Sequence, residues 1–159
     1  MKEKMVTVML PRGRKQEENF VIVSVNGRSW KIMRGVEVRV PECVAEVLEN
    51  SRMMAETARY IGQSGAEGVK LHLLHVLRNT DLAAEWQAGR VQTLELEEYI
   101  SILELCLRNL PPETVIHRLT GDGAKRDLLA PLWSGDKKRV LNAIHQAFLK
   151  DDLIQGSAL

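Results

Sequence analysis

Apolar and polar residues alternate with a period of two from Met5 to about residue 41, which is the pattern of half-buried β-strands. Strand-like runs at residues 20–25 and 29–33 flank Asn26-Gly27, a dipeptide that favours a type I′ hairpin turn. Arg34-Gly35 predicts a second tight turn, after which the chain alternates again as a further strand. The sequence therefore predicts a small antiparallel β-meander over residues 1–41.

The period changes to 3.6 at Pro41. Val44, Val47 and Leu48 share one helix face, and apolar residues continue at helical spacing as far as Gly62. Because serine favours the N-cap position, Ser51 could begin a second helix. Residues 42–66 are therefore predicted to connect two parts of the chain, either as two short abutting helices or as one continuous helix.

Residues 67–159 alternate between strand-like and helix-like patterns. The run at 69–76 is mostly apolar and fits a buried parallel strand, and residues 114–119 are β-branched and strand-like. A short helix is expected at 82–88, a long helix after Thr93 as its N-cap, and a last helix after Asp136 as its N-cap. Strand, helix and strand in this order predict a right-handed βαβ crossover, so the fold class is α/β, and α+β for the whole chain.

The net charge of +1 is unevenly distributed along the chain. Residues 1–40 hold nine Lys and Arg against four Glu, and the remainder is net negative. A basic segment can bind nucleic acid, but no aromatic residues are interleaved with these charges, so we favour a solvated basic face over a nucleic-acid site.

Because no apolar run fits a membrane span or a signal peptide, we expect a cytoplasmic location and no membrane partner. Two cysteines without a leader indicate reduced thiols.

Histidines and a lysine within the predicted strand at 69–76 are the first candidates for chemistry. Side chains three positions apart on a strand point to opposite faces, so His72 and His75 cannot hold one metal ion unless the run is helical. A third metal ligand is not evident either. Lys70 and His72, which are two positions apart, share a face, and one of them could point toward a ligand.

Polar residues also follow both predicted strands. His117-Arg118 lies at the carboxyl end of the second strand, where α/β proteins gather their ligands, or it is simply a strand end before a turn. Thr80 and Asp81 follow the first strand and allow the same two interpretations. Asp122 either lies near such a ligand or caps the next helix.

From about residue 53 to 148 the chain resembles the C-terminal part of a bacterial radical S-adenosylmethionine (SAM) family related to the catalytic subunit of Elongator. Several landmarks in the same order and spacing carry this resemblance. They are Glu56-Thr-Ala-Arg59, Gly68-Val-Lys-Leu-His-Leu-Leu-His75, Thr80-Asp-Leu82, Leu96-Glu-Glu-Tyr99, Leu110-Pro-Pro-Glu113, Ile116-His-Arg-Leu-Thr-Gly-Asp122, Ala130-Pro-Leu-Trp133 and Val140-Leu-Asn-Ala-Ile144.

The resemblance implies a fragment of a partial TIM-like barrel, comprising its last strands and a C-terminal extension. Members of the family hold a 4Fe–4S cluster on three closely spaced cysteines, and the cluster binds S-adenosylmethionine. The two cysteines here, Cys43 and Cys106, cannot form that motif, so we expect no cofactor on this chain. The resemblance brings a set of side chains near a substrate cavity without assigning them roles: Lys70, His72, Thr80, Asp81, His117, Arg118 and Asp122.

Residues 1–51 resemble small structural proteins of tailed bacteriophages, on the strength of residues 26–41 and 44–51. The sequence thus predicts a chimera with a β-module at 1–41, connecting helices at 42–66 and a radical SAM fragment at 67–159. The leading hypothesis is a truncated radical SAM protein without catalytic activity alone. A phage-derived interaction module and one part of a split enzyme are the alternatives, and exposed strand edges favour a protein partner or self-association.

Overall fold

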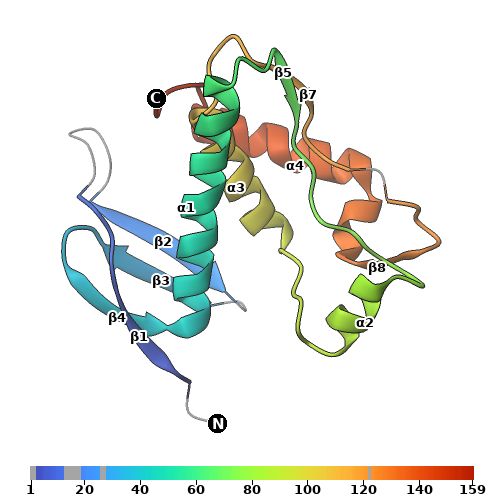
Figure 1. Cartoon of the computed structure of the whole chain (residues 1–159), viewed down its shortest axis with the longest axis horizontal. Helices are drawn as coiled ribbons and strands as arrows, with labels where there is room; N and C mark the ends of the chain where they lie inside the picture. Colours follow the sequence, from blue (N-terminus) through green and yellow to red (C-terminus); the bar gives the residue numbers. More distant parts are fainter. Residues whose placement is uncertain (1–2, 13–18, 26–27, 122) are drawn as a thin grey trace. The chain divides into compact units, whose positions relative to one another are not determined.

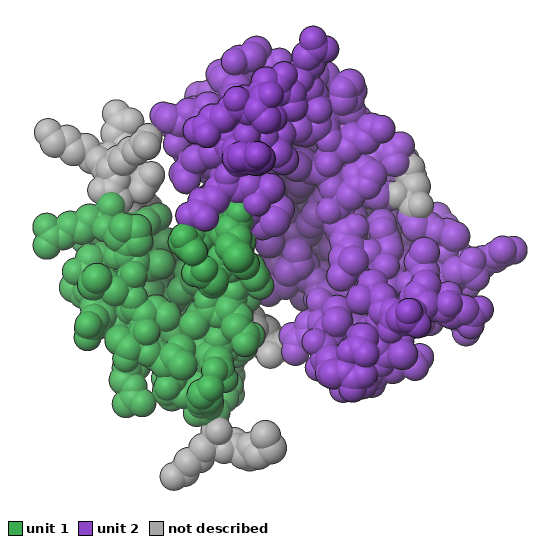
Figure 2. All heavy atoms as spheres, viewed as in Figure 1, with its two compact units in different colours: residues 1–53 green, residues 54–159 purple. Residues whose placement is uncertain are grey.

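The protein is described from a computed structural model that covers residues 3–12, 19–25, 28–121 and 123–159 (Figure 1). Within these residues the fold is mixed α/β, as the sequence predicts, and it comprises small two-stranded sheets and four α-helices. The chain divides into two compact units, Met1–Met53 and Met54–Leu159 (Figure 2). No helix in the described part is long and apolar enough to cross a membrane.

Unit 1 contains two antiparallel strand pairs. The outer pair joins β1 (Met5–Met9) to β4 (Glu37–Pro41), and the inner pair joins β2 (Phe20–Val25) to β3 (Arg28–Met33). The antiparallel prediction is confirmed, but the pairs are nested, whereas a simple meander would pair successive strands. The predicted turn at Arg34-Gly35 is confirmed by the positive φ of Gly35, +76°. The predicted hairpin turn at residues 26–27 lies outside the described residues.

The core of unit 1 forms between these strands and the start of the first helix. Val23, Ile32, Val40 and Val44 are buried, with Ile32 and Val44 wholly inaccessible to solvent. In β3 the half-buried Trp30 and buried Ile32 flank an exposed residue, and in β4 Val38 and Val40 do the same, so the period of two read from the sequence marks the buried faces.

Helix α1 (Glu42–Gln63) is continuous, which decides between the two predicted arrangements. Ser51 lies in its interior, where its Oγ donates a hydrogen bond to the carbonyl oxygen of Val47 at 2.9 Å. Its expected role as an N-cap is therefore wrong, because a serine hydroxyl can bond the preceding turn without ending a helix.

Unit 2 is built around a parallel pair of strands, β5 (Gly68–Lys70) and β7 (Val115–Arg118). The connection between them contains β6 (Val76–Leu77), α2 (Asp81–Gln87) and α3 (Leu96–Arg108), so the predicted parallel crossover is present. The described residues form no closed barrel.

The predicted strand at residues 69–76 is wrong in its extent. Only its beginning pairs with β7, and residues 71–75 have no regular secondary structure. Its end, β6, pairs antiparallel with β8 (Leu128–Ala130), a strand that the sequence did not indicate. Residues 69–76 are mostly apolar because Leu71 and Leu73 pack into the core against α3, and such packing does not require a strand.

Helices α3 and α4 (Lys137–Lys150) pack against each other and carry the main core of unit 2 (Figure 1). Glu95 caps α3 through a reciprocal capping box with Glu98, so the predicted cap at Thr93 is wrong. Asp136 caps α4 by accepting from the backbone N–H of Arg139 at 3.1 Å, as predicted. A short 3₁₀ turn, η1 (Leu132–Gly135), precedes α4.

The C-terminal segment 151–159 closes over the end of α3. The N–H of Gly156 donates to the Leu107 carbonyl at 3.0 Å, and the N–H of Ala158 donates to the Arg108 carbonyl at 2.8 Å. The guanidinium of Arg108 donates in turn to the carbonyl of Asp151 at 3.0 Å. These bonds satisfy carbonyl groups that the last turn of a helix leaves without an intrahelical partner, so the segment is an integral part of unit 2.

Glu104 of α3 makes the stability of this region depend on pH. Partial burial, and next the nearby carboxylate of Asp151, raise the pKa of Glu104 above its ordinary value of 4.5. The folded protein then holds this proton more tightly than the unfolded chain, so stability falls as pH rises from about 4.5 through the raised pKa.

Substituting Glu104→Gln should remove this loss of stability. We expect the variant to melt a few degrees above the wild type at pH 7 and at a similar temperature at pH 4, as measured by circular dichroism. The exposed Glu113 supplies the control, because Glu113→Gln should leave the melting temperature unchanged at both pH 7 and pH 4. An equal gain at both pH values would show that ionisation of Glu104 is not the cause.

Candidate functional site

The carboxyl ends of β5 and β7 carry two of the predicted cavity residues side by side. Lys70 and Arg118 are register partners in the parallel pair, where the register shifts between Val69 and Lys70. Both side chains are exposed. The backbone N–H of Leu71 then donates to the carbonyl of Arg118 at 2.9 Å, which extends the pairing one residue further. The structure thus brings these two cations together at one edge of the pair.

His117 of β7 lies across the start of β5. A Cβ built on Gly68 would stand 2.8 Å from Cδ2 of the His117 ring and nearer still to its Nε2. Any larger residue at position 68 would collide with the imidazole, so glycine is what allows the ring to lie there. His117 is exposed and shares the strand pair with Lys70 and Arg118.

His72 and His75 lie in the irregular segment 71–75, so their expected placement on opposite faces of a strand is wrong. His72 is exposed. The half-buried ring of His75 lies against Gly121 and Gly123: added Cβ atoms there would come within 3.1 Å of its Nδ1 and 2.9 Å of its Cδ2, respectively. Two glycines thus let the loop after β7 close around this imidazole.

Thr80 and Asp81 lie at the start of α2, next to a different sheet from the one that carries Lys70 and Arg118. They follow β6, which pairs with β8 and not with the parallel strands. The Thr80 hydroxyl accepts from the N–H of Ala83 at 3.2 Å and donates to the carbonyl of Leu77 at 2.7 Å, so it caps α2. Asp81 is exposed in the first turn of that helix. A substrate role for either remains a prediction, and Asp122 lies outside the described residues.

Tyr99 of α3, which the sequence did not mark as a functional residue, makes hydrogen-bond contacts with the two segments that follow β5 and β7. The hydroxyl of Tyr99 donates to the Leu119 carbonyl at 3.1 Å and lies 3.5 Å from the Leu71 carbonyl. Burial raises the pKa of Tyr99 strongly, so the hydroxyl remains a hydrogen-bond donor. Its ring also contacts Trp133 at 5.7 Å between centroids. Tyr99 looks like an ordinary apolar-face residue in the sequence, because its two acceptors come from distant segments.

The described residues do not fit an iron–sulfur cluster. Such a cluster needs several thiolate ligands, and the chain has two cysteines, one in each unit. Burial raises the pKa of Cys106 to about 11, which keeps that thiol protonated and unsuited to bind metal. No group of three His, Cys, Asp or Glu side chains in the described part is arranged to hold a metal ion.

Comparison with known proteins identifies the parallel pair and the helices around it. The Radical_SAM C-terminal domain matches residues 66–150, more than half of the chain. The chain belongs to this family. The match begins just before β5 and ends with α4, so it includes Lys70, His72, His117 and Arg118.

Curated relatives extend the comparison. The chain is 35% identical over 109 residues to the uncharacterized protein YtqA of Bacillus subtilis, covering 69% of this chain and 34% of the relative. It is 33% identical over 133 residues to the protein YhcC of Escherichia coli, covering 83% and 40%. The uncharacterized protein MJ0486 of Methanocaldococcus jannaschii is 28% identical over 110 residues, covering 69% and 34%. The chain therefore spans between about a third and two fifths of the length of these relatives.

The similarity to the Escherichia coli relative is longer than the family match. Unit 2 begins at Met54, and a matched stretch of 133 residues in a chain of 159 cannot fit within it. The similarity therefore continues into unit 1, which the sequence analysis assigned to a different origin.

Proposed function

We propose that this chain forms the substrate-facing C-terminal part of a radical SAM protein and has no turnover by itself. The chemistry would come from a cluster-bearing segment, in the same longer protein or in a separate polypeptide. The observation that carries this proposal is the parallel pair β5–β7. Parallel sheets are normally larger and covered on both faces, so two parallel strands favour further strands beside them.

Within this proposal the exposed side chains at the carboxyl ends of β5 and β7 face the substrate. These are Lys70, His72 and Arg118, and the position agrees with the general location of ligands in α/β proteins. The ring of His117 lies over the first residue of β5, so its place in the set rests on the resemblance alone. Thr80, Asp81 and Asp122 complete the predicted set. Because the donor atoms of the described residues do not fit a cluster, we assign no chemical step to this chain.

Two finer expectations belong to the same proposal. Kinship with the catalytic subunit of Elongator rests on the landmarks between residues 56 and 144. The phage-like character of unit 1 rests on residues 26–51, and its β2–β3 pair exposes Ile22 at 63% and Met33 at 39%, which would suit a protein partner. The longer similarity to the Escherichia coli relative supports a single origin for the chain instead, so the phage-derived module is the alternative to this proposal and not part of it.

Reconstitution tests the proposed function. The purified chain, treated anaerobically with iron and sulfide, should bind iron well below one cluster per chain and should not cleave S-adenosylmethionine. Mixing it with a cluster-bearing N-terminal segment from another member of the family should yield a complex in which cofactor cleavage is restored. Stoichiometric cluster binding by the chain alone, or failure of the two parts to associate, would overturn the proposal.

The exposed edge can be tested in the same complex. The double substitution Lys70→Ala and Arg118→Ala should leave association and cofactor cleavage intact, because neither residue contacts the cluster in the proposal, while lowering affinity for any substrate found. Lys125→Ala combined with Arg126→Ala, which removes two exposed charges outside this edge, is the matched control.

A further inference from the structure

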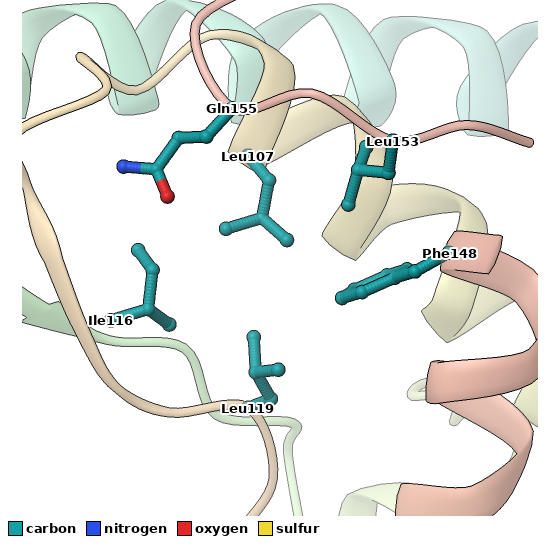
Figure 3. A pocket seen from close by; sticks show the side chains of 6 residues that line it. All are labelled: Leu107, Ile116, Leu119, Phe148, Leu153 and Gln155. Carbon is teal, nitrogen blue, oxygen red and sulfur yellow. The ribbon is translucent and has the colours of Figure 1, made fainter.

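A small hollow lies in unit 2, on the C-terminal side of α3 (Figure 3). Its volume is about 250 Å³, and it is formed by residues of α3, of β7 and the position that follows it, of α4 and of the C-terminal segment. Five of its six lining side chains are apolar and the sixth is an amide: Leu107, Ile116, Leu119, Phe148, Leu153 and Gln155. None of them carries a charge, so a charged ligand would lose its hydration there without compensation.

The amide of Gln155 has a fixed orientation. Its Nε2 donates to the carbonyl oxygen of Pro111 at 2.6 Å and to that of Thr114 at 2.8 Å. Both partners can only accept hydrogen bonds, so the amide cannot be turned around without losing both. The oxygen, Oε1, consequently faces the hollow, as Figure 3 shows.

The wall that carries Gln155 is held in place on both sides. Gly156 donates through its N–H to the Leu107 carbonyl at 3.0 Å, and the N–H of Leu153 donates to the Phe148 carbonyl at 3.0 Å. Leu107 is almost fully buried. The acceptor therefore stands at a set position before any ligand arrives, which lowers the entropic cost of binding.

We propose that this hollow binds a small uncharged molecule with an apolar body and a single N–H or O–H group directed at Oε1 of Gln155. Ligand sites generally combine apolar walls with a few placed polar groups, and this one offers one acceptor and no donor. A dry cavity of about 150 Å³ accommodates benzene, so about 250 Å³ suits a ligand of one or two rings. The proposal is independent of the proposed function.

Indole and indene test the proposal, because they have nearly the same shape and only indole has an N–H. Each is titrated into the full ¹⁵N-labelled chain and followed by NMR. We expect indole to bind with a dissociation constant on the order of 0.1–1 mM and indene about five- to tenfold more weakly. The side-chain amide signals of Gln155 should shift with indole.

Equal affinities for the two ligands, no binding of indole up to about 10 mM, or shifts confined to other residues would each overturn the proposal.

A pair of tryptophan substitutions separates this hollow from other apolar surface. Leu119→Trp should fill the space and weaken indole binding at least tenfold. Leu149→Trp changes a side chain of α4 that is 61% exposed and does not line the hollow, so binding should be unchanged. If Leu149→Trp weakens binding as much as Leu119→Trp does, the ligand lies elsewhere. Should Leu119→Trp fail to fold, the comparison of indole with indene on the wild-type chain still decides the outcome.

Discussion

Replacing Gly62 by alanine should destabilise the protein by about 1–2 kcal/mol, although the same change in a helix usually stabilises. Glycine in a helix interior costs about 0.5–1 kcal/mol relative to alanine, and Gly62, the last but one residue of α1, would regain part of this as alanine. Here, however, an added Cβ would stand 2.7 Å from Cγ of Pro111 and nearer still to its Cδ. The proline ring cannot rotate away, and overpacking of this kind costs about 1–3 kcal/mol.

A double-mutant cycle separates the two effects of this substitution. Gly62→Ala, Pro111→Ala and the double variant are compared by urea unfolding, with the slope m checked for constancy. In the absence of the proline ring, the helix preference for alanine should emerge, so Gly62→Ala should be neutral or stabilising on the Pro111→Ala background. If Gly62→Ala destabilises equally on both backgrounds, the contact with Pro111 is not responsible.

Local sequence signals predicted those elements whose ends are determined nearby. Asp136 caps α4 and Gly89 follows the end of α2, because an N-cap or a terminal glycine acts within a few residues. The cap of α2, Thr80, was not predicted. Alternation within each strand and the tight turn at Gly35 predicted the strands of unit 1, but not the nested pairing of β1 with β4 around β2 and β3. The continuous helix α1 could not be told from two helices, since Ser51 is compatible with both.

Features that depend on distant segments were missed or misplaced. Residues 69–76 look like one buried strand because Leu71 and Leu73 are core residues, yet the segment changes partners in its middle. Strand β8 has three residues, and it pairs with β6, some fifty positions earlier in the chain. A pattern of apolar residues reports burial, and it does not report which segment will supply the pairing.

The candidate site shows the same division. The sequence placed Arg118 at a strand end and Lys70 inside the predicted strand at 69–76, and the parallel pairing brings the two together. It could not show that Tyr99 donates to the Leu119 carbonyl, or that Gln155 is oriented by two other carbonyls. Both side chains make hydrogen bonds to carbonyl groups more than 15 positions away in the sequence. These bonds exist only once the distant segments have packed together.

Replacing Gly156 by alanine should cost about 2–4 kcal/mol and should disturb the hollow beside it. Gly156 has φ of +79°, a region in which a side chain costs about 1–2 kcal/mol. In addition, its Cβ would lie 2.8 Å from Cδ of Pro112 and 3.3 Å from the Leu110 carbonyl oxygen. Moving the backbone to relieve this contact would strain the hydrogen bond to Leu107 and shift Gln155.

Gly65 provides a matched control for this prediction. It has nearly the same φ, +78°, and an added Cβ there would meet nothing within 4 Å. Gly65→Ala should therefore show only the backbone cost of about 1–2 kcal/mol, and the remainder in Gly156→Ala measures the contact with Pro112. Urea unfolding gives both values. An equal loss of unfolding free energy in the two variants would mean that the C-terminal segment moves to accommodate the added methyl group at no cost. Gln155 would then be held less firmly than its two hydrogen bonds indicate.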